Sequence, residues 1–203
     1  MRVRDMFSKN EKYLSCFCII LFLNLSFKVE SNTDIKIKIL DYLSSIQNFS
    51  ASFIQNDNET LSEGKVYIGK KRVRAEYLSP SKILIVLDED KAMYYNYELE
   101  EDEFFNPKNT NAWFFYDIFR NPLFFEDANI ELKDNQLTLE KHGLDVEGRK
   151  YFIKIYFEND PLVLRKIEVQ NNQQSLTLSI YDHNHNEELS RDLFKLINPK
   201  LLN

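Results

Sequence analysis

The sequence predicts one mainly β domain (α+β): a half-open antiparallel β-barrel of about ten or eleven strands that encloses a hydrophobic cavity and is covered by helices. Short stretches in which apolar and polar residues alternate recur along the chain, with turn residues between them every eight to twelve positions. Phe, Tyr and Trp make up 14% of the 203 residues, which favours strands and a bulky apolar interior. Two further segments have helical patterns and need a sheet face on which to bury their apolar residues.

The N-terminal segment resembles an export signal. Residues 1–13 are net basic, and residues 14–27 are apolar and uncharged. As a helix the apolar run would reach about 21 Å, short of the ~30 Å hydrocarbon core of a bilayer. A basic start followed by a short apolar run is typical of a cleaved signal peptide, so we expect a signal peptide over residues 1–31 and one domain over residues 32–203. An uncleaved membrane anchor is the alternative, because Lys28 is a poor neighbour for a cleavage site.

Removal of this segment would change the cysteine content and the net charge of the chain. Both cysteines, Cys16 and Cys18, lie inside the apolar run, so the exported chain would have no thiol, disulfide or Cys-ligated metal. Residues 1–31 hold five basic and three acidic side chains, so cleavage changes the net charge from −6 to −8. This balance argues against nucleic acid or an anionic membrane as a standing partner.

The exported chain opens with a predicted helix over residues 34–46. Its apolar residues have the spacing of one helical face. They are Ile35, Ile39, Tyr42, Leu43 and Ile46.

Strand patterns dominate the rest of the chain. Before residue 109 they cover residues 49–55, 63–69, 72–77, 83–87, 92–97 and 98–105. After residue 125 they cover residues 129–133, 136–141, 150–158, 162–170 and 175–181, with 193–196 as a possible last strand. Their period-2 alternation divides each strand between an inward and an outward face.

The middle segment, residues 109–125, interrupts the strands with a short helix. Asn109 or Asn111 can cap its start, and Pro122 ends it. Its apolar residues cannot share one face, so we predict a movable lid or plug over the cavity, with an ordinary core helix as the alternative. The predicted plug residues are Trp113, Phe114, Phe115, Ile118 and Phe119.

The usual catalytic constellations are absent from the sequence. It contains no G-x-S-x-G, P-loop or H-E-x-x-H motif, and the exported chain would have no cysteine nucleophile. His183 and His185 would share one strand face, but no third metal ligand is near them in the sequence, and we expect a solvated turn there. We therefore predict no enzyme activity, no cofactor and no metal.

Several motifs together resemble the periplasmic outer-membrane lipoprotein carrier LolA family, over essentially the whole exported chain. Residues 49–55 resemble its F-x-A-x-F-x-Q strand, and residues 63–68 resemble the E-G strand that follows. Residues 72–77 with Pro80 are similar to its R-F-R-W-E-Y-x-x-P segment, and residues 94–96 to its next aromatic strand. Each motif is short, but their order and spacing match.

The resemblance implies a function without covalent chemistry. A carrier of this family holds the acyl chains of lipoproteins in its cavity. It receives them from an inner-membrane lipoprotein-releasing ABC transporter and delivers them to the outer-membrane receptor LolB or an equivalent. The expected location is the periplasm, and the expected state is a monomer. The alternatives are a carrier of a glycolipid or another lipid, the receptor itself, a stress sensor, or less plausibly a periplasmic hydrolase.

Strand alternation and the resemblance assign the candidate site. In this family an arginine holds the lid, and here Lys70 and Lys71 stand where Arg-Pro is usual, so Lys70 is the candidate latch. Ala75 stands where the family tends to have Trp. The predicted acyl-chain cavity is lined by Phe49, Ala51, Phe53, Val66, Ile68, Val73, Tyr77, Ile85, Tyr95, Ile153, Ile155, Leu176 and Leu178.

Overall fold

The computed structural model describes residues 31–171, 174–185 and 188–202, so the predicted signal peptide lies outside the described residues except for Ser31. Residues Asn32–Asn203 form one compact unit. Within the described part of the chain, no helix is long and apolar enough to span a bilayer.

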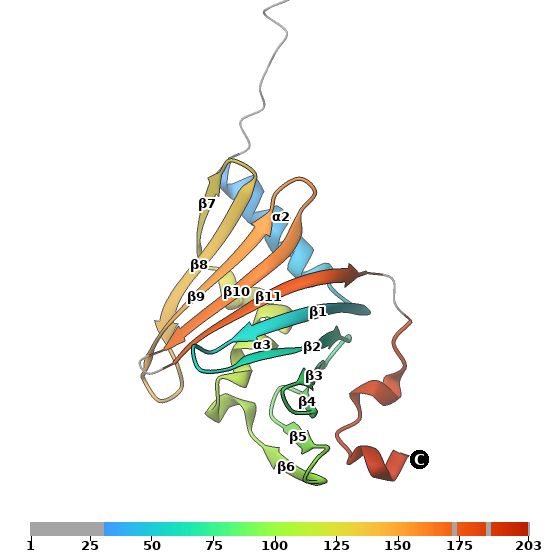
Figure 1. Cartoon of the computed structure of the whole chain (residues 1–203). Helices are drawn as coiled ribbons and strands as arrows, with labels where there is room; N and C mark the ends of the chain where they lie inside the picture. Colours follow the sequence, from blue (N-terminus) through green and yellow to red (C-terminus); the bar gives the residue numbers. More distant parts are fainter. Residues whose placement is uncertain (1–30, 172–173, 186–187, 203) are drawn as a thin grey trace, which may run out of the picture. The chain divides into compact units, whose positions relative to one another are not determined.

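The unit is built on one antiparallel sheet of eleven strands that does not close on itself (Figure 1). The strands lie in the order β6-β5-β4-β3-β2-β1-β11-β10-β9-β8-β7, so β6 and β7 are the two edges. The fold-class prediction of a half-open barrel with helices is confirmed. The strands are β1 (Phe49–Asn56), β2 (Leu61–Ile68), β3 (Val73–Ser79), β4 (Ile83–Leu87), β5 (Ala92–Asn96), β6 (Glu101–Phe105), β7 (Asn129–Lys133), β8 (Gln136–Leu144), β9 (Lys150–Glu158), β10 (Val163–Asn171) and β11 (Ser175–Asn184).

Period-2 alternation gives the sheet one apolar inward face. In β1, Phe49, Ala51 and Phe53 are buried, while the residues between them are partly exposed. In β9 the buried set is Tyr151, Ile153, Ile155 and Phe157. These residues belong to one large core cluster, which both α-helices complete.

Helix α2 (Asn32–Ser45) covers part of this face, as its sequence pattern predicts. Its buried residues, Ile35, Ile39 and Leu43, lie at i, i+4 and i+8 and therefore form one stripe. On its polar side the Lys38 ammonium group donates to Asn159 Oδ1 over 3.1 Å. Apolar burial and this polar contact together fix α2 on the sheet.

The middle segment forms helix α3 (Ala112–Arg120), followed by the 3₁₀ helix Pro122–Phe125. Asn111 occupies the N-cap position, as one of the two predicted caps, but its side chain makes no capping hydrogen bond. The backbone N–H of Ala112 instead donates to Thr110 Oγ1 over 3.2 Å. The Asn111 amide is thus free to contact another element.

The C-terminal segment covers the opposite face of β3, β4 and β5. Leu196 packs on a second, small apolar cluster of Leu84, Val86, Met93 and Tyr95. The predicted last strand over residues 193–196 is wrong, because Arg191–Phe194 form a 3₁₀ helix. Two arginines bind carbonyls of this segment. Arg72, just before β3, donates from Nη1 to Phe194 O over 2.8 Å, and Arg74 of β3 donates from Nη1 to Leu193 O over 2.6 Å. These side-chain hydrogen bonds hold the segment in place of the backbone hydrogen bonds that a paired strand would make.

Gly64 allows the inner face to pack closely at the join of β1, β2 and β3. A Cβ at this position would lie 2.6 Å from the Phe53 ring and would meet the Glu76 carbonyl. We predict that Gly64→Ala lowers the free energy of unfolding by about 1–3 kcal/mol, the usual cost of an overpacked core. Urea denaturation measures this effect. The exposed Lys65→Ala next to it should change stability by less than about 0.5 kcal/mol, and equal midpoints for both variants would contradict the packing argument.

Candidate functional site

An apolar cavity of about 210 Å³ lies between the inward face of the sheet and helix α3. Most of its lining consists of aliphatic and aromatic side chains, and the polar members are two amides and a tyrosine. The lining residues are Phe53, Gln55, Val66, Val73, Ala75, Tyr77, Ile85, Leu87, Asn111, Ala112, Phe115, Phe119, Leu176, Leu178 and Ile180.

The register of the sheet explains how these residues meet. Val73 pairs with Leu87 and Ala75 pairs with Ile85, so one face of β3 and β4 forms a continuous wall. Across β1 and β11, Gln55 pairs with Leu178. The small Ala75 side chain leaves open space at the centre of this wall.

Several of the predicted cavity residues line this space. They are Phe53, Val66, Val73, Tyr77, Ile85, Leu176 and Leu178. Others belong to the main core but lie outside the cavity lining: Phe49, Ala51, Ile68, Ile153 and Ile155. Ala75, Leu87 and Ile180 continue the same alternation and could have been found from it.

Tyr95 lies on the opposite face, so its assignment to the cavity is wrong. Ile85, which lines the cavity, pairs with Tyr94, while Tyr95 pairs with Leu84. Tyr95 is 1% exposed in the small cluster under the C-terminal segment. Both faces of β4 and β5 are apolar here, and therefore the sequence pattern does not reveal which face points inward.

Helix α3 presents apolar residues in three directions, as its pattern requires. Phe115 and Phe119 face the cavity, and Phe114 and Ile118 are buried in the main core. Trp113 packs against the edge of the Tyr151 ring, with the ring centroids 5.5 Å apart. The helix therefore both fills the barrel and forms the roof of the cavity.

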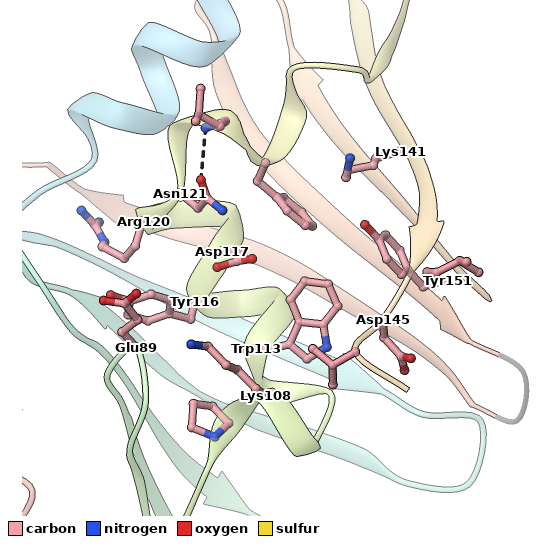
Figure 2. A pocket seen from close by; sticks show the side chains of 15 residues that line it. Glu89, Lys108, Trp113, Tyr116, Asp117, Arg120, Asn121, Lys141, Asp145 and Tyr151 are labelled. Atoms are coloured by element: carbon pink, nitrogen blue, oxygen red, sulfur yellow. Dashed lines mark hydrogen bonds between the residues drawn. The ribbon is translucent and has the colours of Figure 1, made fainter. Parts of the chain in front are cut away.

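A second, wider hollow of about 710 Å³ lies over the outward side of α3 (Figure 2). Trp113, Tyr116 and Asp117 come from the helix itself. One rim carries Glu89, between β4 and β5, and the other carries Tyr151 of β9. The helix thus spans the opening between the two arms of the sheet.

Arg120 is the least compensated charge on α3. Its Nη2 donates to the Ile46 carbonyl over 2.5 Å, while its Nε is buried without a partner among the described residues. Burial lowers the pKa of the Arg120 guanidinium to about 10. Burial also raises the pKa of Asp117 on the same helix. Both charged forms are therefore less favourable here than in water.

Among the described residues, no hydrogen bond joins Lys70 to α3. Lys70 lies in the turn between β2 and β3 and lines a separate hollow with Arg191 and Phe194 of the C-terminal segment. Within the described residues, the start of α3 is held by Asn111, whose Nδ2 donates to Gln174 Oε1 over 2.6 Å. Asn171 Nδ2 donates to Asn111 Oδ1 over 2.7 Å. The role of Lys70 as a latch therefore stays a prediction from the family resemblance, while Asn111 is the residue that bonds the start of α3 to the sheet.

The solvated turn expected at the two C-terminal histidines is seen only in part, because His185 is exposed in a bend, whereas His183 belongs to β11. His183 is half-buried at the end of β11 and contacts the Leu164 carbonyl over 2.7 Å. His185 packs against the Phe49 ring, with the ring centroids 5.0 Å apart. No group of three or more potential metal ligands occurs among the described residues.

An open sheet that curves around an apolar cavity, with an aromatic helix across the opening, defines a binder of apolar ligands. The family model for the outer membrane lipoprotein carrier protein LolA matches residues 44–197, and the chain belongs to this family. Proteins of this family are periplasmic carriers of lipids or lipoproteins and not enzymes. No curated protein sequence matches the chain.

Comparison with solved structures found one with a TM-score above 0.5 among those named below, and it supports the fold. An uncharacterized conserved protein from Thermus thermophilus aligns with a TM-score of 0.54 and 11% identity, over 83% of this chain and 96% of that one. MucB of Pseudomonas aeruginosa, solved in complex with MucA, aligns with a TM-score of 0.48 and 11% identity, over 81% of this chain and 61% of that one. LprF from Mycobacterium bovis aligns with a TM-score of 0.40 and 10% identity, over 79% of this chain and 98% of that one.

The Asn111 contacts predict a way to loosen α3 without changing the apolar residues that line the cavity. Asn111→Ala removes two side-chain hydrogen bonds, each with a net contribution of about 1 kcal/mol or less. Amide hydrogen exchange in α3 should then be about ten-fold faster, while exchange in β9 stays unchanged. Asn109→Ala, an exposed neighbour, is the matched control and should leave α3 protection intact. Unchanged exchange in Asn111→Ala would show that these amides do not hold the helix.

Proposed function

We propose that the chain is exported to the periplasm and carries the acyl chains of lipoproteins in its cavity. The observation that carries this proposal is an apolar cavity roofed by an aromatic helix in a member of the lipoprotein carrier family. Each CH₂ of an acyl chain gains about 0.8 kcal/mol on burial, so a free lipoprotein would aggregate or return to a membrane. A protein cavity removes this driving force during transit.

The size of the cavity supports a role for α3 as a lid. Its volume of about 210 Å³ is below the ~300–1,000 Å³ of typical small-molecule sites. A long acyl chain therefore needs more room than the closed form provides. Outward movement of Phe115 and Phe119 with α3 would supply that room, because both rings line the cavity.

The packing of α3 also suits release of the cargo. Carriers must give up their ligand, so net affinity should be intermediate, and the cost of displacing the lid lowers it. In this proposal an inner-membrane lipoprotein-releasing ABC transporter supplies the cargo, and an outer-membrane receptor, LolB or an equivalent, accepts it. Membership in the lipoprotein carrier family supports this choice of partners.

Trp113 provides a direct test, because it is the only tryptophan of the chain and lies on the lid. Addition of a diacylated lipopeptide should shift its emission and change its quenching by iodide, since opening of α3 separates the indole from Tyr151. The deacylated peptide should do neither. An equally buried Trp113 with and without acylated cargo would mean that α3 is a fixed core helix.

A cavity-filling variant provides the matched control for this titration. Ala75→Phe places a ring in the cavity and should abolish the lipopeptide response, whereas Lys65→Phe adds the same ring on an exposed position and should preserve it. A full response in Ala75→Phe would place the acyl chains outside this cavity.

The export step has its own test. We predict a mature N-terminus near Asn32 in protein that is released by osmotic shock. Intact-mass measurement checks this prediction. A membrane-bound protein whose mass still includes residues 14–27 would instead support an uncleaved anchor.

A further inference from the structure

The polar residues of the cavity gather at one end of it. Gln55 lies near the end of β1 and pairs with Leu178 of β11. Tyr77 reaches it from β3, and its hydroxyl donates to Gln55 Oε1 over 2.8 Å. Asn111 is bonded to Gln174 just before β11 begins. The other lining residues are apolar, so the cavity has one hydrogen-bonding end and one hydrocarbon end.

At the polar end, one set of donors is unused. The single proton of the Tyr77 hydroxyl is directed at Gln55 Oε1, so the two N–H groups of the Gln55 amide have no partner among the described residues. The Asn111 amide, by contrast, is already engaged by Gln174 and Asn171. Gln55 therefore has both amide N–H groups open to a ligand, whereas the Asn111 amide is tied to Gln174 and Asn171 through its nitrogen and its oxygen.

The Tyr77 contact fixes which side of the Gln55 amide is available. The Tyr77 ring packs edge-on against Phe53, with the ring centroids 5.1 Å apart, so its hydroxyl is held in place. Burial raises the pKa of Tyr77 to about 12, and the hydroxyl stays protonated as a donor at neutral pH. Gln55 Oε1 is thereby occupied, and its amide nitrogen is left for a ligand.

The absence of charge determines the chemistry of that ligand. None of the described residues that line the cavity is ionised at neutral pH, so a carboxylate would lose its hydration without a cation in exchange. A carbonyl oxygen carries no net charge and accepts the hydrogen bond that an amide N–H offers.

We propose that Gln55, positioned by Tyr77, donates an N–H to the carbonyl oxygen of an ester- or amide-linked acyl chain, and that the hydrocarbon tail extends toward Val73 and Leu87. This inference rests on the proposed function, since it assumes an acylated ligand, and adds the group by which the ligand is recognised and oriented. Neutral acyl esters and amides are thus preferred over alkyl ethers and free fatty acids.

The test compares two cysteine peptides that differ only in this group. One carries two ester-linked palmitoyl chains on a glyceryl thioether, and the other carries ether-linked hexadecyl chains. Calorimetry with the mature chain should show about five- to ten-fold tighter binding of the ester, the value of about one hydrogen bond. Gln55→Leu should remove this preference, and Tyr77→Phe should reduce it by leaving the amide free to rotate. Gln170→Leu, the same change on an exposed strand position, should keep it.

The outcomes separate this inference from the proposed function. Equal affinity of the wild-type chain for ester and ether peptides, or an unchanged preference in Gln55→Leu, overturns the role of Gln55 and leaves the carrier proposal standing. Failure of both lipids to bind the wild-type chain overturns the carrier proposal and this inference with it. Even if Gln55→Leu does not fold, the two peptides can be compared on the wild-type chain, and equal affinities there would still overturn recognition of the carbonyl group.

Discussion

The structure depends on the need to bury the apolar inward face of a sheet that stays open. Because β6 and β7 do not pair, the eleven strands cannot enclose their own core as a closed barrel does. Helices α2 and α3 must therefore cover the apolar inward face, and α2 packs against it more closely than α3 does. The stripe of α2 packs on the sheet, whereas α3 roofs a void of about 210 Å³. Atoms that line a void lose dispersion contacts, and an acyl chain can restore them.

The wall opposite α3 is held more firmly than the roof. Strand β4 is covered on both faces, because Leu196 of the C-terminal segment packs on its outward side. The carbonyls that Arg72 and Arg74 bind join the same segment to β3. The wall is also held by the backbone ladder between β3 and β4, whereas the roof is tied to its surroundings by side-chain hydrogen bonds at Asn111 and at Arg120. A rigid wall and a looser helix are the arrangement in which cargo can displace one side of the cavity without disturbing the sheet.

Much of this arrangement can be predicted from the local spacing of apolar residues in the sequence. The 3.6-residue spacing of Ile35, Ile39 and Leu43 predicts α2, and the alternation around Phe49 and Phe53 predicts β1. Hydrophobic periodicity does not predict the structure where both faces of a strand are buried, or where contacts with residues far away in the sequence determine the local conformation. The alternation of Leu193–Leu196 resembles a strand, but two arginines about 120 residues earlier hold it as a 3₁₀ helix and loop. The role of Gln55 is likewise invisible locally, because it depends on a hydroxyl from another strand.

Under the lid role that we propose for α3, Arg120 disfavours the closed position. In that position the guanidinium is partly desolvated, its Nε has no partner among the described residues, and its pKa falls to about 10 through burial. Asp117 on the same helix is also destabilised in its charged form by burial, since its pKa is raised. Movement of α3 toward solvent would rehydrate both groups and recover this cost. In this proposal the apolar rings of the helix favour the closed form and its charged groups favour the open one, so a ligand that binds only the open form shifts the population toward it.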